Sequence, residues 1–308
     1  MQAERSSKKL KINKFLKTYG GCYLFLIPAF IGFFVFTVYP VVYSFFLSFT
    51  DFNGVYMTKI GFFNYIQLFS DSVNNGWYTF SRSYLATFEY VLIALPASNI
   101  LSFCVSLLLH SNIKGRGFFR TVFYLPALIP GVAMALFSAD LFSSNGIVNA
   151  VLQAIGLPKN TFYLDPATAL PTYIISGWFG IGGTTIMWLA AFNNVPPTMI
   201  EAARLDGAGS ARVLFQIMIP MCTPIIFYNL INGLIGFLQI FDSYAAVGTG
   251  PENSMRFVCV LIYGVSFLEY DMGLGCAIAW TLFIIVAILT AFAFKMSGTW
   301  VYYGEDEA

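Results

Sequence analysis

Residues 18–50 read TYGGCYLFLIPAFIGFFVFTVYPVVYSFFLSFT and contain no charged side chain. A helix needs about 20 apolar residues to cross the hydrocarbon of a membrane. The apolar core of a cleaved signal peptide is only about 7–15 residues long. The length of this run therefore predicts a retained membrane span.

The rest of the chain has the same character, because 58% of its 308 residues are hydrophobic and only 10% are charged. A soluble domain carries roughly 25% charged residues. Charge-free windows of spanning length fall at 18–50, 90–109, 121–139, 166–200, 213–241 and 272–294. Lipid offers no partner for an open strand edge, so these windows predict helices.

The fold class that follows is an all-α membrane protein with six transmembrane helices. We expect these helices at about 20–48, 85–109, 119–142, 167–192, 220–247 and 272–295, within one membrane domain over 18–296. A basic N-terminus over 1–17 and a tail over 297–308 flank this domain, and both are expected in the cytoplasm.

The distribution of Lys and Arg predicts this orientation, with both ends inside the cell. Twelve of the 16 basic residues then fall in cytoplasmic segments. The four that fall outside are Lys59, Arg82, Lys159 and Arg256. An excess of basic residues on the cytoplasmic side is the usual rule for membrane proteins.

Two shorter windows do not fit a full span. Residues 141–158 are uncharged but rich in Ser and Asn, and we interpret them as a segment at the outer surface. Residues 257–268 are apolar but too short to cross the membrane, and we expect an amphipathic piece outside the bilayer.

The sequence lacks the patterns of common enzyme sites. No G-x-x-x-x-G-K-[ST] phosphate loop, G-x-S-x-G elbow or H-E-x-x-H helix occurs. The five Cys and one His show no metal-ligand spacing, and a net charge of +1 gives no case for nucleic acid. We predict no catalytic site, metal or cofactor, so any ATP hydrolysis that drives transport belongs to a partner subunit.

Three carboxylates lie near the ends of expected helices: Glu89, Asp140 and Asp242. An ionisable group inside a membrane helix often marks a proton or ion path. We interpret these three as interfacial carboxylates, which gives weak support to proton coupling.

The loop between the fourth and fifth expected helices reads PPTMIEAARLDGAGSARVLFQIMIP over 196–220. Thr198 with Glu201 has the spacing of a capping box, which predicts the start of a short helix. Gly207 is suited to end that helix in a left-handed conformation. Ser210 can cap a second short helix, and Pro220 either ends that helix or opens the next one.

This helix pair is expected in the cytoplasm, and we predict that it exposes six apolar residues there: Met199, Ile200, Leu205, Val213, Leu214 and Phe215. An amphipathic helix outside the membrane commonly binds a groove in a partner protein. A loop that lies on the membrane surface is the alternative.

The loop also resembles a known motif in three of its parts: Glu201-Ala202-Ala203, Gly207, and IMIP at 217–220. They resemble the EAA loop of permease subunits of binding-protein-dependent ATP-binding-cassette importers. That pattern is E-A-A, three residues, G, nine residues, I-x-L-P, and every spacing holds, with Ile219 in place of Leu.

The resemblance implies that the loop docks into a groove of an ATPase subunit and transmits its closure to the membrane helices. The residues that it implies for this coupling contact are Glu201, Ala202, Ala203, Asp206, Gly207, Phe215 and Pro220. It also implies four kinds of partner: a second similar permease, two ATPase copies, an extracytoplasmic binding protein and membrane lipid.

Shorter segments along the chain resemble the carbohydrate class of these permeases. They are LIPAF at 26–30, VYPVVYS at 38–44, SFTDF at 48–52, FFR at 118–120, GP at 250–251 and WVYY at 300–303. Substrates of this class include oligosaccharides, some monosaccharides and glycerol phosphates. The resemblance implies a multi-pass protein of the cell membrane that passes a sugar.

A sugar path needs hydrogen-bonding side chains and space on one helix face. In the fifth expected helix such a stripe is formed by Asn229, Asn232, Gly236 and Gln239. In the fourth, Ser176 and Gly180 lie on a stripe of small residues, and Trp178 could stack on a sugar ring. Helix packing through small and amide residues is the alternative for both stripes.

We therefore predict the permease subunit of an ATP-driven sugar importer. A permease for glycerol phosphate or another small solute is the alternative within the class. A secondary transporter is the alternative outside it, although no coupling-ion residues stand out.

Overall fold

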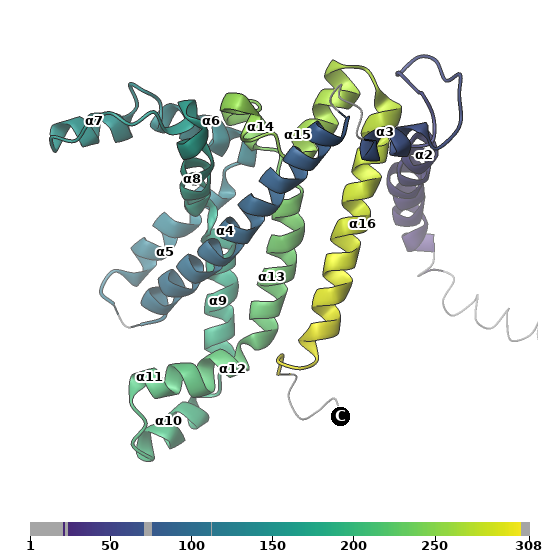
Figure 1. Ribbon diagram of the computed structural model, residues 1–308. Helices are drawn as coiled ribbons and strands as arrows, with labels where there is room; N and C mark the ends of the chain where they lie inside the picture. Colours follow the sequence, from purple (N-terminus) through teal and green to yellow (C-terminus); the bar gives the residue numbers. More distant parts are fainter. Residues whose placement is uncertain (1–20, 22–23, 71–75, 112, 303–308) are drawn as a thin grey trace, which may run out of the picture.

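The computed structural model describes residues 21, 24–70, 76–111 and 113–302 (Figure 1). Within these residues every regular element is a helix, and the only β-type pairing is an isolated bridge between Thr50 and Ile60. The all-α prediction is confirmed.

The α-helices are α2 (Tyr39–Leu47), α3 (Phe63–Phe69), α4 (Gly76–His110), α5 (Arg116–Tyr124), α6 (Gly131–Leu141), α7 (Ile147–Ala154), α8 (Pro166–Gly177), α9 (Gly182–Asn194), α10 (Pro197–Leu205), α11 (Ser210–Val213), α12 (Ile219–Met221), α13 (Thr223–Leu238), α14 (Ser243–Val247), α15 (Val258–Tyr263) and α16 (Met272–Ser297). Short 3-10 or π-helical turns join several of them: η1 (Phe34–Val38), η2 (Pro126–Leu128), η3 (Phe162–Leu164), η4 (Trp178–Gly180), η5 (Leu214–Met218), η6 (Pro251–Asn253) and η7 (Gly264–Leu268).

Three helical stretches of the described chain are long and apolar enough to cross a membrane by themselves: Leu24–Leu47, Thr79–His110 and Met272–Ser297. Three further candidates are bent pairs, Arg116–Leu128 with Gly131–Leu141, Pro166–Gly180 with Gly182–Asn194, and Ser210–Met221 with Thr223–Leu238. Counting each pair as one span gives up to six, in the order that the charge-free windows predict.

The predicted helices at 119–142, 167–192 and 220–247 each correspond to a bent pair. The pairs turn by 104°, 51° and 63° respectively. At the first bend Ile129 is extended, because the ring of Pro130 disfavours a helical conformation in the residue before it. At the third bend the helix breaks at Cys222 and restarts with a proline in the first turn of α13.

The fifth predicted helix also ends early. It stops at Leu238, and the separate short helix α14 follows after a turn. α14 packs against α6. The Asp242 carboxylate lies very close to Gly131: a Cβ added to Gly131 would be 2.1 Å from Asp242 Oδ2.

α4 is the central helix of the bundle, with α9 and α13 packed along it (Figure 1). Buried polar side chains join α4 to its neighbours. Thr87 Oγ1 accepts a hydrogen bond from the Val258 amide at 3.0 Å, and Ser106 Oγ donates to the Thr185 carbonyl at 3.0 Å. Such bonds between helices stabilise packing where lipid supplies no hydrophobic drive.

The first span, Leu24–Leu47, lies beside α16 at the edge of the bundle (Figure 1). It is attached near its C-terminal end, where Trp280 Nε1 donates to Ser44 Oγ at 3.2 Å. Asn64 of α3 closes the following turn by donating to the carbonyls of Ser48 and Thr50 at 3.0 and 2.8 Å.

The segment 257–268 is part of the core, whereas the sequence suggested an amphipathic piece. Phe257, Val258 and Val260 are at most 1% exposed, and α15 packs between α4 and α16. The segment 141–158 contains α7, whose apolar residues Ile147 and Val151 are exposed. The exposure of these α7 residues agrees with the predicted surface segment at 141–158.

Candidate functional site

The loop at 196–220 extends from one end of the bundle as two short helices, α10 and α11 (Figure 1). Gly207 joins them with a φ of +84°, which confirms the predicted left-handed turn. The Ala208 amide donates to the Ala203 carbonyl at 2.9 Å, and the Gly207 amide donates to Arg204 at 3.0 Å. Hydrogen bonds of this kind satisfy the last carbonyls of a helix.

The predicted side-chain caps are wrong. α10 begins at Pro197, its N-cap is Pro196, and no side chain caps it. Thr198 therefore lies inside the first turn, because the fixed φ of Pro197 already suits a helix start. Ser210 is likewise the first residue of α11, whose N-cap is Gly209.

The loop has an anchored side and an exposed side. Val213 is 4% exposed and packs with Phe192 and Met218, and Ile200, Ala203 and Leu214 pack against this cluster. The prediction that Ile200, Val213 and Leu214 are exposed is therefore wrong for Val213 and only partly right for the other two.

The exposed side carries most of the residues that the sequence assigns to coupling: Glu201, Ala202, Asp206, Gly207, Phe215 and Pro220. Leu205 is 89% exposed and Phe215 is 66% exposed. Two large apolar side chains beside two carboxylates form a surface of the kind that fits a groove in a partner.

The bend between α12 and α13, which follows the loop, is hydrogen-bonded to the last residues of the described chain. Thr223 Oγ1 donates to the Pro220 carbonyl at 2.7 Å and accepts from the Tyr302 amide at 2.8 Å. Val301 is 8% exposed, so the segment after α16 packs against this bend. Sequence patterns gave no signal for this contact between residues 79 positions apart.

The predicted stripe on α13 is present for three of its four members. Asn232, Gly236 and Gln239 are exposed, and Asn232 Nδ2 donates to the Tyr228 carbonyl at 3.0 Å. Asn229 is 7% exposed, and its buried Nδ2 has no hydrogen-bond partner in the described chain.

The predicted residues of the fourth helix lie at the break between α8 and α9. Trp178 is 39% exposed, and a Cβ added to Gly180 would meet no atom within 4 Å. Ser176 faces the other way: its Oγ donates to the Tyr173 carbonyl at 2.7 Å and accepts from the Tyr163 hydroxyl at 3.2 Å. The structure therefore groups Trp178 with Gly180 and separates Ser176 from them.

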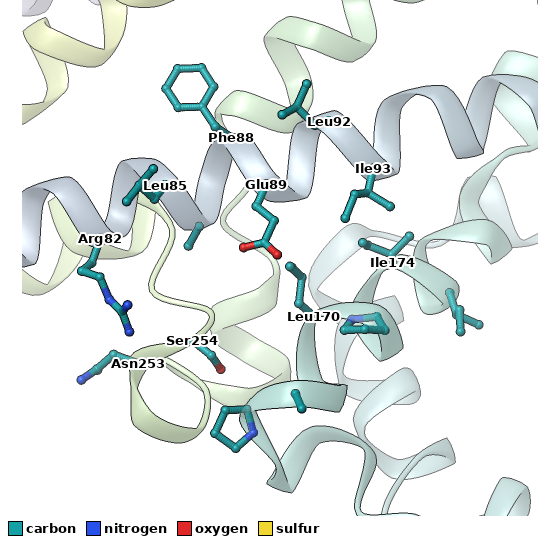
Figure 2. Close-up of a pocket in the computed structure, with 15 residues that line it drawn as sticks. Arg82, Leu85, Phe88, Glu89, Leu92, Ile93, Leu170, Ile174, Asn253 and Ser254 are labelled. Carbon is teal, nitrogen blue, oxygen red and sulfur yellow. The ribbon is translucent and has the colours of Figure 1, made fainter.

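A cavity of about 840 Å³ lies between α4, α8 and η6, and sequence patterns did not predict it (Figure 2). Figure 2 shows Glu89 directed into this space, with Leu170 opposite and Ser254 to one side. The sequence placed Glu89 at a helix end, but α4 begins at Gly76, about 20 Å earlier along its axis. Glu89 therefore lies inside α4 and not at its end, while its interfacial position in the membrane stays a prediction.

Comparison with known proteins agrees with this architecture. Residues 98–296 match the model of the family described as binding-protein-dependent transport system inner membrane component. The probable ABC transporter permease protein YesP of Bacillus subtilis is 33% identical over 291 residues, covering 92% of this chain and 93% of that protein. The multiple sugar-binding transport system permease protein MsmF of Streptococcus mutans is 29% identical, covering 94% and 98% respectively.

A solved structure of a bacterial alginate ABC transporter, in complex with a periplasmic protein that binds an alginate pentasaccharide, has the same fold. One of its chains aligns with a TM-score of 0.79 at 23% identity, covering 94% of this chain and 98% of that chain. At this level of sequence identity, the alignment shows a common fold and nothing about function. From the family match and the long shared alignments, this chain is a multi-pass membrane protein that belongs to the family of inner membrane components of binding-protein-dependent transport systems.

Proposed function

We propose that this chain is the permease subunit of an ATP-driven sugar importer. It forms half of the solute path and couples to a separate ATPase subunit. The observation that carries the proposal is the loop at 196–220, which combines the spacing of the EAA motif with an anchored side and an exposed side. The similarity to MsmF, a permease protein of a multiple sugar-binding transport system, supports a carbohydrate as the solute.

The coupling step acts through the exposed side of the loop. Glu201, Ala202 and Leu205 dock into a groove of the ATPase, and the small Ala side chain allows close approach. The other side of the loop packs on Phe192 of α9, and the loop continues into α13. Movement of the docked loop therefore reaches both helices, which is rigid-body coupling between two states.

The topology has six spans with both ends in the cytoplasm. This orientation places the coupling loop on the side where ATP is available, and the bias in Lys and Arg supports it. A second similar permease, two ATPase copies and an extracytoplasmic binding protein complete the importer. The description of the family as a binding-protein-dependent transport system supports the binding protein as a partner.

The solute path runs past the α8–α9 break and the exposed stripe of α13. Irregular backbone at membrane depth is tolerated only where protein or a water-filled cavity covers it. The break leaves Gly177 and Gly180 exposed, so a path for a hydrated solute fits this position. Trp178 stacks on a sugar ring, while Asn232, Gly236 and Gln239 give hydrogen bonds and space. Asn229 and Ser176 lie behind this surface and support it.

The first test is co-purification of the chain, expressed together with its neighbouring genes. Glu201→Lys reverses a charge on the exposed side of the loop, and we expect it to lose the ATPase subunit or the solute-stimulated ATP hydrolysis. Lys159→Glu is the control, because it reverses an exposed charge in the segment expected on the opposite side of the membrane. If no ATPase associates with the wild-type chain, the importer assignment is wrong.

A further inference from the structure

The segment that follows α16 turns back toward the coupling loop. α16 ends at Ser297, at the same end of the bundle as α10 and α11 (Figure 1). The amides of Trp300 and Val301 both donate to the Ser297 carbonyl, at 3.1 and 2.9 Å, and so form a tight turn. Val301 is 8% exposed, so this turn packs against the bundle. Residues 298–302 are called the strap below.

Aromatic rings join the strap to α13 and to the end of α16. The centroid of the Trp300 ring lies 6.0 Å from that of Phe227, and the Phe227 centroid lies 5.0 Å from that of Phe294 on α16. Both pairs meet edge to face, which is a favourable arrangement for aromatic rings. Phe227 lies about one turn after the bend at Thr223, so the start of α13 contacts both the strap and α16.

Thr223 joins the strap to the bend with a single hydroxyl group. Pro224 has no amide hydrogen, so it cannot bond the Pro220 carbonyl as a continuous helix would require. Thr223 Oγ1 donates to this carbonyl instead, at 2.7 Å. Because a hydroxyl has only one proton, Oγ1 can then only accept, and the Tyr302 amide donates to it at 2.8 Å. One oxygen therefore both compensates the proline and holds the strap.

The contact at Thr223 has open space beside it. A hollow of about 480 Å³ lies between the bend and the strap, lined by Ile219, Pro220 and Thr223 on one side and by residues 298–302 on the other. Loss of the Thr223 hydroxyl therefore leaves the strap room to shift away from the bend.

α16 connects the strap to the first span. It runs without a break over 26 residues, from Met272 to Ser297. Near its other end Trp280 Nε1 donates to Ser44 Oγ at 3.2 Å, and the Trp280 ring lies 4.7 Å from that of Phe45. A packed helix shifts as a unit, so a displacement at the strap reaches the first span.

We infer that the strap makes α16 move together with the coupling loop, and that Thr223 is the positioning residue that joins them. This inference rests on the proposed function, in which the ATPase displaces the loop. Contacts at Phe192 and the chain itself carry that displacement to α9 and α13. The strap adds a separate route to α16 and, through Trp280, to the first span.

The test measures the distance between spin labels at Met199 and Ile288, which are 47% and 62% exposed, in the complex with the ATPase and the second permease. The labels are carried by unnatural amino acids, so the native cysteines stay in place. On addition of ATP the wild-type distance should stay constant, because the loop and α16 move together. With Thr223→Val it should shift by about 2 Å, a usual displacement of a helix in such transitions.

Hydrogen exchange at the Tyr302 amide reports the contact itself. Thr223→Val should speed this exchange about fivefold, since it removes the acceptor of the amide. Thr223→Ser keeps the hydroxyl and should restore both the slow exchange and the constant distance. Thr299→Val is the matched control within the strap, because the Thr299 hydroxyl donates only to the nearby Met296 carbonyl, at 2.8 Å.

The outcomes separate this inference from the proposed function. If the ATPase binds and ATP shifts the distance equally in wild type and Thr223→Val, the inference is overturned and the importer assignment stands. Faster exchange at Tyr302 without a change in the distance would show that the strap only ends α16, which also overturns it. If no ATPase binds the wild-type complex, the proposed function fails, and the inference fails with it.

Discussion

At the scale of single residues, backbone conformation separates glycines that look alike in the sequence. Gly207 and Gly209 lie two positions apart in the coupling loop, and neither meets an atom within 4 Å of an added Cβ. They differ in φ, which is +84° at Gly207 and −71° at Gly209. Only the first requires glycine, because a left-handed conformation is strained for other residues.

This difference gives a matched pair of variants. Gly207→Ala should destabilise the turn by about 1 kcal/mol. Such a loss weakens association with the ATPase about fivefold. Gly209→Ala should leave association unchanged. Both effects can be measured as binding of the purified ATPase to the permease complex. Equal binding by the two variants would show that the left-handed turn is dispensable for docking.

Asp51 organises the turn that follows the first span. Its carboxylate accepts a hydrogen bond from the Thr58 hydroxyl, and from the amides of Thr58 and Lys59 at 2.8 and 2.9 Å. These bonds, chiefly that of the Thr58 hydroxyl, lower the pKa of Asp51 from its ordinary 3.8 to about 2. The lowered pKa means that folding of the turn favours the ionised form.

The turn should therefore keep its full stabilisation above about pH 4 and lose it as the pH falls toward 2. Cleavage by pepsin next to Tyr56 measures opening of the turn. The cleavage rate should rise as the pH falls from about 4 to about 2, and it should rise more steeply than the unfolded fraction of the whole protein. Asp51→Asn should make the turn equally open at pH 4 and pH 2. A wild-type turn whose cleavage is independent of pH would contradict the role of Asp51.

At the scale of elements, three helices that look continuous in hydropathy are bent, and one of these bends lies in close contact with a neighbouring helix. Gly182 begins α9 directly after the break, against η2 and the end of α5. An added Cβ there would lie 2.5 Å from the Phe123 carbonyl oxygen, whereas the neighbouring Gly183 meets nothing within 4 Å. The small-residue pattern alone does not distinguish these two positions.

Gly182→Ala should destabilise the bundle by about 1–3 kcal/mol, since backbone on the opposite side must move. Gly183→Ala should be close to neutral. The melting temperatures of the two variants in detergent provide the comparison, with retained ATPase binding as a check on folding. A Gly182→Ala protein as stable as wild type would mean that α5 and α9 do not approach this closely.

At the scale of the whole molecule, α4 contacts α9 and α13 along one side and, together with α8, lines the groove with Glu89 on another. The coupling loop is joined to this bundle through Phe192 and through the bend at Thr223. A movement at the loop can therefore reach both sides through rigid packed elements.

The sequence by itself determined the membrane class, the helical fold and the resemblance of the loop at 196–220 to the EAA motif. These depend on local properties: runs without charge, the absence of strand partners in lipid, and the spacing of Glu201, Gly207 and Pro220. Only the tertiary structure decided where and how sharply the expected helices bend, that Ser176 and Asn229 turn inward, and that Glu89 lies in a groove between α4 and α8. Hydropathy cannot show these features. The bend of a helix and the direction in which its side chains point depend on contacts with helices that are far apart in the chain.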